Sequence, residues 1–133
     1  MGLIGDVIWS EHTHTAREKP PKGAIIQRRL SGGTACDVLG IVYSHMGVYV
    51  GDGKVIHLNR RGKRDTRVVL DTLETFCAGK PWRLQRRALD DSHANSIVWT
   101  AYRIMRNQNN RYNEQYSLIG QNCEHFCREC YET

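Results

Sequence analysis

The pattern of apolar and polar positions is clearest in the middle of the chain, where two β-rich segments flank a glycine-containing turn. The first segment ends in SHMGVYV, the turn is Gly51-Asp52-Gly53, and the second segment is KVIHLN. Runs of β-branched and aromatic residues that flank Asp-Gly predict a β-hairpin. AIIQRRL (24–30) and TRVVLDTL (66–73) predict two more strands, and GDVIW (5–9) predicts a short first strand.

Two segments nearer the C-terminus predict helices. Asp90, Asp91 and Ser92 are N-cap candidates for the first, which has apolar residues at positions 94, 97, 98, 101, 104 and 105. The second is predicted from Cys123 to Tyr131, and its apolar face contains Cys123, Phe126, Cys127 and Cys130.

The register of the hairpin determines the relation between its two histidines. A two-residue Asp52-Gly53 turn places His57 opposite Val48, so that His45 and His57 point to opposite faces. A three-residue loop places His57 opposite Gly47, and His45 is then a diagonal neighbour on the same face. We therefore expect a bulged turn if the two histidines act together.

Cys123 is the candidate nucleophile, because a thiol at a helix N-terminus is favoured in its charged form. His45 is the candidate base that takes the thiol proton, and His57 is the candidate group that orients the base. The alternative for Cys123 is a buried structural thiol. The alternative for the histidines is a pair of sheet residues hydrogen-bonded to the backbone.

SHMGVYVGDGKVIHL resembles the H-box, and QNCEHF resembles the NC box, of the lecithin retinol acyltransferase-like superfamily. The superfamily includes small cellular phospholipase/acyltransferases and the H-box/NC type 2A proteins of some picornaviruses. The resemblance implies the catalytic residues Cys123, His45 and His57 and an α+β, permuted papain-like (NlpC-type) fold, in which an antiparallel sheet packs against helices. It also implies a reaction in which an acyl chain leaves a phospholipid, is held as a thioester and passes to water or an amine.

Some features depart from the cellular enzymes. The segment before the H-box is longer, Met46 stands where many cellular members have an aromatic residue, and a hydrophobic C-terminal anchor is not expected. The compact basic chain therefore resembles the picornaviral 2A type, a non-structural protein that supports viral replication. In that type the boxes occur with or without hydrolase activity, so an active phospholipase A/acyltransferase is the alternative.

The formal net charge is +5, and the chain has no apolar segment long enough to cross a bilayer. A basic surface favours anionic partners. RNA or an anionic membrane surface is a candidate partner of Arg60, Arg61, Lys63 and Arg64, and a host protein is another candidate. A basic RNA-binding module is therefore the third functional hypothesis. We expect a cytoplasmic protein that associates with membranes without spanning them.

Five cysteines, three of them in CEHFCREC, suit a reducing compartment better than a disulfide framework. Cys127 and Cys130 are expected to be core thiols, as are Cys36 and Cys77. A zinc site formed by Cys123, Cys127 and Cys130 is a rival, but the spacing lacks the paired CxxC of structural zinc sites. We expect no metal and no cofactor. The chain is predicted to be a single H-box/NC domain (1–133), with residues 10–40 as an insertion or loop region.

Overall fold

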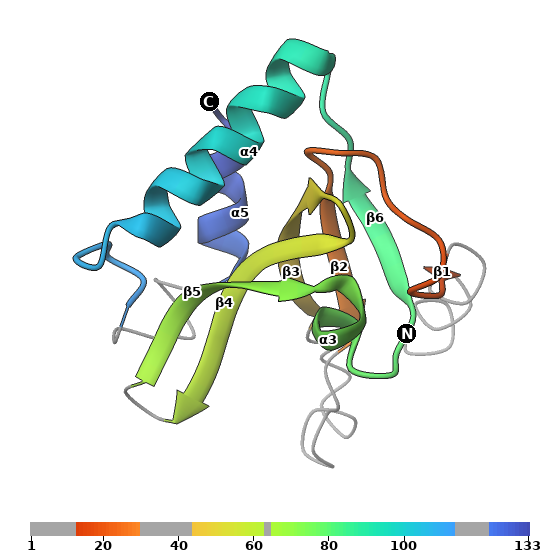
Figure 1. Cartoon of the computed structure of the whole chain (residues 1–133), viewed down its shortest axis with the longest axis horizontal. Coiled ribbons are helices and arrows are strands. Elements are labelled where there is room, and N and C mark those ends of the chain that lie inside the picture. Colours follow the sequence, from red (N-terminus) through yellow and green to blue (C-terminus); the bar gives the residue numbers. More distant parts are fainter. Residues whose placement is uncertain (1–12, 30–43, 63–64, 114–122) are drawn as a thin grey trace, which may run out of the picture.

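The computed structural model of the protein describes residues 13–29, 44–62, 65–113 and 123–133. Its centre is a six-stranded sheet with the strand order β1-β6-β2-β3-β4-β5 (Figure 1). Every neighbouring pair in this sheet is antiparallel. The strands are β1 (Thr13–His14), β2 (Ile25–Arg29), β3 (Ser44–Gly51), β4 (Lys54–Gly62), β5 (Asp65–Thr72) and β6 (Trp82–Arg86).

The helices cover both faces of the sheet and are α3 (Leu73–Cys77), α4 (Asp91–Arg106) and α5 (Cys123–Tyr131). Successive side chains of a strand point to opposite faces of the sheet, so the core has two parts, one on each face. Val48 and Ile56 belong to the cluster that packs with α4 and α5, whereas Tyr49 and Val55 belong to the cluster that packs with α3. The α+β fold with an antiparallel sheet is confirmed, and it is compatible with a permuted papain-like fold.

The hairpin of β3 and β4 has the bulged register that the histidine pair requires. Gly47 lies opposite His57, and the register shifts between Tyr49 and Gly51. Gly51, Asp52 and Gly53 all have positive φ angles, of 99°, 54° and 72°. The bulged turn is therefore confirmed, and its left-handed residues extend over the whole connection rather than being confined to Gly53.

The predicted strand at 66–73 ends one residue early. The side chain of Thr72 accepts a hydrogen bond from the Thr75 backbone N–H and caps α3, so Leu73 begins this short helix. The region 10–40, predicted as an insertion or loop region, contains the two-residue strand β1 as well as β2. The predicted strand GDVIW, the first part of the H-box strand and Cys36 lie outside the described residues.

Helix α5 has the predicted bounds, and α4 begins directly after a predicted N-cap residue. The Asp90 side chain accepts a hydrogen bond from the His93 backbone N–H and caps α4. The apolar face of α5 is buried at Phe126, Cys127 and Cys130. Thr100 of α4 is polar but only 2% exposed, because its position lies on the same side of the helix as Ile97 and Ile104.

Gly47 gives a test of the packing beneath the hairpin. A methyl group at this position would lie 2.6 Å from Val55 Cγ1, 2.9 Å from Phe76 Cε2 and 3.1 Å from His57 Cβ. We expect Gly47→Ala to lower the free energy of unfolding by about 1–3 kcal/mol, measured by denaturant titration. Adding Val55→Ala removes the nearest of these atoms, so the penalty of Gly47→Ala should be smaller in that background. Equal penalties in both backgrounds would contradict this packing.

Candidate active site

Two histidines meet on the face of the sheet that α3 covers. His45 lies near the start of β3 and His57 in the middle of β4, and the hairpin register makes them diagonal neighbours. His45 Nε2 lies 2.7 Å from His57 Nδ1, which is a hydrogen-bond distance. The predicted meeting of the two imidazoles is therefore observed.

Asp71 extends this contact into a chain of three residues. His57 lies opposite Val69 on β5, so Asp71, two residues further along β5, is on the same face. His57 Nε2 lies 2.7 Å from Asp71 Oδ2. His57 is buried, and the Asp71 side chain is 26% exposed. Each member of the chain thus has a partner on the neighbouring strand.

The carboxylate fixes the direction of this hydrogen-bonded chain, because it can only accept. His57 donates from Nε2 to Asp71 and therefore accepts at Nδ1. His45 then donates from Nε2 to His57, which leaves His45 Nδ1 without a proton. An imidazole nitrogen held in this form is what a general base requires.

Phe76 on α3 and Arg28 on β2 border the histidine pair. The Phe76 ring stacks on His45 and meets His57 edge-on, with centroid distances of 5.3 Å in both cases. Arg28 lies opposite His45 in the sheet, and its Nε donates to the carbonyl oxygen of Phe76. A low-polarity wall and a fixed cation thus enclose one side of the site.

Cys123 is the first residue of α5, as predicted, and its thiol hydrogen-bonds to backbone groups of Met46, Cys123 and Glu124. The β3–β4 pairing ends at Gly47 and His57. The Tyr49 N–H donates to Ala24 on the β2 side, and backbone N–H groups alternate between the two sides of a strand. The Met46 N–H, three residues earlier, therefore points to the β4 side, just beyond the Gly47–His57 pair. The thiol is therefore held next to the residue that follows His45.

Burial dominates the protonation of the site. It lowers the pKa of His45 to about 3, with further lowering by His57 and Arg28. Burial also lowers the pKa of His57, against the opposing effect of the hydrogen bond to Asp71. The pKa of Cys123 is raised by burial, although backbone hydrogen bonds favour the thiolate. The resting pair is a neutral thiol and a neutral imidazole, so nucleophilic attack requires proton transfer to a base.

The remaining predicted residues have structural positions. Cys77, Cys127 and Cys130 are buried, as expected of core thiols. Within the four described ranges, no group of three or more His, Cys, Asp or Glu side chains is arranged to hold a metal ion, so the zinc alternative gains no support. The backbone of Arg60 and Arg61 belongs to β4, whereas Lys63 and Arg64 lie outside the described residues. No helix among the described segments is long and apolar enough to cross a membrane.

Sequence reasoning did not identify Asp71, Phe76 or Arg28 as parts of the site. Asp71 is the alternating neighbour of Val69 in a predicted strand, so the signal was present in TRVVLDTL. It was not decisive, because the register of β4 with β5 depends on the basic turn between them. For Arg28, the pairing with His45 joins segments separated by a long connection.

The burial of both histidines predicts that acid destabilises the protein. Between pH 6.5 and about 3, the unfolded chain binds a proton at His45 that the folded protein does not bind. The free energy of unfolding should therefore fall as the pH is lowered through this window, by up to about 1.4 kcal/mol per pH unit for each such group. Denaturant titrations at several pH values measure this slope.

The matched variants for this slope are His45→Gln and His14→Gln. His45→Gln removes a buried titrating group and should give a shallower dependence than wild type. His14→Gln changes a histidine outside the site and keeps the buried His45, so it should retain the acid destabilisation that His45 causes. Parallel curves for wild type and His45→Gln would show that His45 does not carry this dependence.

The comparison with protein-family models gives one match. The model of the lecithin retinol acyltransferase family matches residues 28–133, which include both histidines, Asp71 and Cys123. No curated protein matches the sequence. Because the matched segment covers most of the chain and contains the whole hydrogen-bonded site, the protein belongs to the lecithin retinol acyltransferase family.

Proposed function

We propose that the protein is a thiol acyltransferase or phospholipase in which Cys123 takes the acyl group of a phospholipid. Family membership supports an enzyme of this class. The observation that carries the proposal is the chain of hydrogen bonds from His45 through His57 to Asp71, together with a cysteine at a helix N-terminus whose thiol hydrogen-bonds to the backbone of the residue after His45. These residues supply a base, its orienting groups and a nucleophile.

The proposed reaction has two steps. His45 Nδ1 takes the Cys123 proton as sulfur attacks the ester carbonyl carbon, and the ester C–O bond breaks as the proton passes to the leaving alkoxide. The acyl group is then a thioester on Cys123. Water or an amine attacks this thioester, gives its proton to His45, and releases the thiolate, which is reprotonated by His45. His57 and Asp71 keep the His45 ring in the required tautomer throughout.

Arg28 supports this reaction as a positioning residue. It interacts electrostatically with His45, His57 and Cys123, and it helps to hold the pKa values of both histidines down. His45 is therefore neutral over the physiological pH range and can accept a proton, although its lowered pKa makes it a weaker base than a free imidazole. The same positive charge favours the thiolate and the negatively charged intermediate once the proton has moved.

The proposal predicts a covalent adduct that depends on the site residues. Incubation with a short-chain phosphatidylcholine should add the mass of one acyl chain to the wild-type protein, measured by intact-protein mass spectrometry. Cys123→Ala and His45→Ala should give no adduct. Asp71→Asn should slow adduct formation by at least about tenfold, because the amide no longer enforces the tautomer of His57.

Cys77→Ala serves as the control, because this buried thiol lies near Arg28 but outside the hydrogen-bonded chain. It should retain the adduct. An adduct that persists on Cys123→Ala would contradict the assignment of the nucleophile. A folded wild-type protein that gives no adduct at any pH would contradict the enzymatic proposal and favour a binding role.

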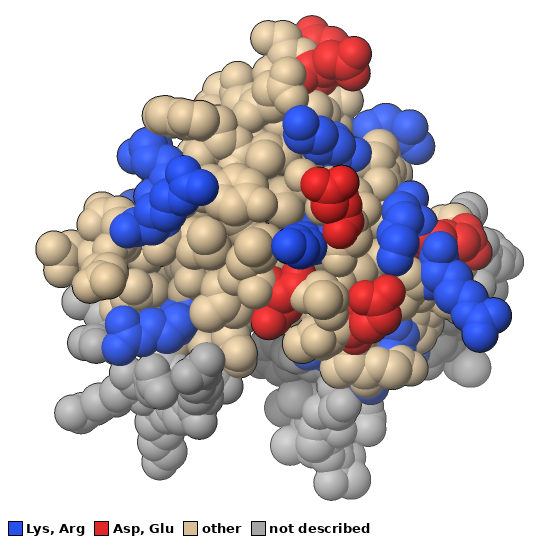
Figure 2. Space-filling model, viewed as in Figure 1, with Lys and Arg blue, Asp and Glu red and all other residues tan. Residues whose placement is uncertain are grey.

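A second candidate function is binding of RNA, as in a 2A-like non-structural protein that supports viral replication. One observation favours it: the outer face of α4 presents aromatic and arginine side chains together. Trp99 is 66% exposed, and the Arg103 guanidinium carbon lies 5.5 Å from its ring centroid. Arg106 lies 5.2 Å from the Tyr102 ring in the same way. Figure 2 shows basic side chains over the C-terminal half of α4 and acidic side chains at its N-terminal end.

The RNA candidate predicts a salt-dependent affinity that depends on this helix face. Trp99→Ala should weaken binding of single-stranded RNA by about tenfold through loss of stacking. Arg103→Gln should reduce the slope of log affinity against log salt concentration by about 1, the value for one lost phosphate contact. Leu89→Ala is the control, since this residue is 80% exposed but precedes the helix. Affinity that is independent of salt and of both changes would exclude RNA binding by α4.

A further inference from the structure

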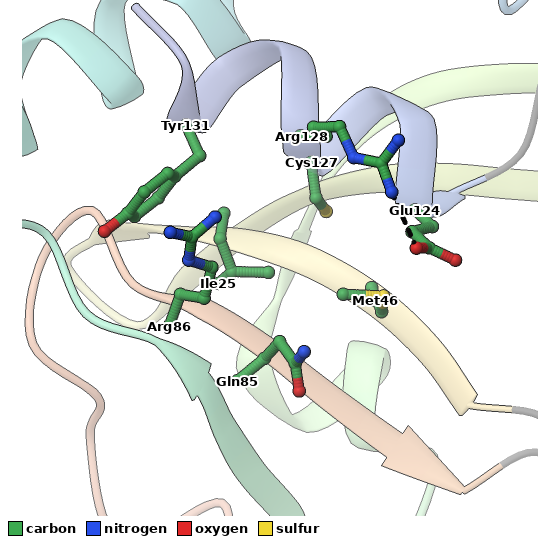
Figure 3. Close-up of a pocket in the computed structure, with 8 residues that line it drawn as sticks. All are labelled: Ile25, Met46, Gln85, Arg86, Glu124, Cys127, Arg128 and Tyr131. Atoms are coloured by element: carbon green, nitrogen blue, oxygen red, sulfur yellow. Dashed lines mark hydrogen bonds and ion pairs between the residues drawn. The ribbon is translucent and has the colours of Figure 1, made fainter.

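A hollow of about 130 Å³ lies between α5 and the β2–β3–β6 part of the sheet (Figure 3). Its walls come from Ile25, Met46, Gln85, Arg86, Glu124, Cys127, Arg128 and Tyr131. Two of these residues adjoin the candidate active site in sequence, because Glu124 follows Cys123 and Met46 follows His45. The hollow therefore begins next to the nucleophile and extends along α5 toward Tyr131.

Part of the hollow is apolar and its far end is cationic. Ile25 and Met46 line the hollow from the sheet and Cys127 lines it from α5. The Arg86 guanidinium carbon lies 3.9 Å from the centroid of the Tyr131 ring. Figure 3 shows Arg86 beside Tyr131 at one end and Glu124 at the other. Glu124 pairs with Arg128 at 3.0 Å, so these two charges offset each other. Among the described residues, no carboxylate pairs with Arg86.

A β-bulge brings Arg86 into this position. Ile25 lies opposite Arg86, whereas Ile26 lies opposite Leu84, so Gln85 is an extra residue in β6. Consecutive residues of a regular strand point to opposite faces, but the bulge allows both Gln85 and Arg86 to line the hollow. The bulge thus directs a polar amide and a cation toward the same space.

The Tyr131 ring that supports Arg86 is itself fixed by three contacts. Its hydroxyl donates to the carbonyl oxygen of Arg87 at 2.9 Å, and its own carbonyl accepts from His93 Nε2 at 2.7 Å. The His93 ring also meets the Tyr131 ring edge-on. A guanidinium stacked on a fixed ring is held in one orientation, which suits bidentate binding of an oxyanion.

We propose that this hollow binds the phosphate group of the acyl donor, with Arg86 as the residue that recognises it; this rests on the proposed acyl transfer at Cys123. The nine-residue helix α5 rises about 12 Å from Cys123 to Tyr131. A glycerophosphate group together with the Arg86 side chain covers such a span. The donor ester then lies at Cys123, its glycerol part crosses the hollow at Met46, and its phosphate meets Arg86.

The proposal predicts a loss that is specific to phosphate-bearing donors. Arg86→Gln should slow formation of the hexanoyl adduct from dihexanoyl phosphatidylcholine by about 10- to 100-fold, because it removes a charge-assisted contact. The adduct from 4-nitrophenyl hexanoate, which carries the same acyl chain without phosphate, should form at the wild-type rate. Arg86→Lys keeps the charge, so its rate of adduct formation from dihexanoyl phosphatidylcholine should lie between the rates of wild type and Arg86→Gln. Arg87→Gln, an exposed neighbour that does not line the hollow, should match wild type with both donors.

Two outcomes of this experiment would overturn the proposal. One is an Arg86→Gln protein that reacts with dihexanoyl phosphatidylcholine as fast as wild type. The other is an equal slowing with both donors, which would indicate a general effect on the site rather than phosphate recognition. An adduct from 4-nitrophenyl hexanoate that is lost in Cys123→Ala would preserve the thiol nucleophile even if the phosphate site failed.

A binding measurement keeps the two proposals distinguishable if no donor labels the wild-type protein. Dihexanoyl phosphatidylcholine, titrated into Cys123→Ala and followed by NMR, should shift signals of Arg86 and of residues that line the hollow. The shifts should be absent with dihexanoylglycerol and absent in the double variant with Arg86→Gln. Equal shifts with both lipids, or none with either, would overturn the phosphate site.

Discussion

The register of the β3–β4 hairpin is the constraint on which the candidate site depends. A single extra residue between Tyr49 and Gly51 puts His57 opposite Gly47 rather than opposite Val48, and this brings both imidazoles to one face. Glycine at position 47 leaves room for this register, because a Cβ atom there would lie too close to Val55, Phe76 and His57. A slip of one residue would move His57 to the opposite face of the sheet, so register and chemistry cannot vary independently.

The second condition is the turn from β5 into α3. Asp71 is the second-last residue of β5 and orients His57, and Thr72 caps the helix that carries Phe76. One short segment thus supplies both the carboxylate and the aromatic wall of the site. Burial by this wall disfavours charge on the histidines, and the carboxylate partly offsets that effect at His57. The result is a base that is neutral, oriented and still able to accept a proton.

Helix α5 connects the nucleophile with the proposed phosphate site. Its first residue is Cys123, its buried face packs on the sheet, and its last residue, Tyr131, carries the stacked Arg86. The stacking depends on a bulge in β6, just as the histidine pair depends on a bulge in the hairpin. In both places an irregularity of the sheet redirects a side chain that a regular strand would point elsewhere. The proposed donor site is therefore a property of how the helix and the sheet edge meet.

Local pattern in the sequence was sufficient for the elements around the site and for three of its residues. The glycine-containing hairpin, the Asp90 cap of α4 and the bounds of α5 follow from nearest-neighbour chemistry, and the H-box and NC-box motifs point to His45, His57 and Cys123. Asp71, Phe76, Arg28 and Arg86 could not be assigned in this way. Their roles depend on the pairing of β5 with β4 and of β2 with β3 and β6, which joins residues far apart in the chain. Such pairings are determined by the packing of the whole sheet against its helices, and only the tertiary structure decided them, because alternation within one strand does not specify which strand lies beside it.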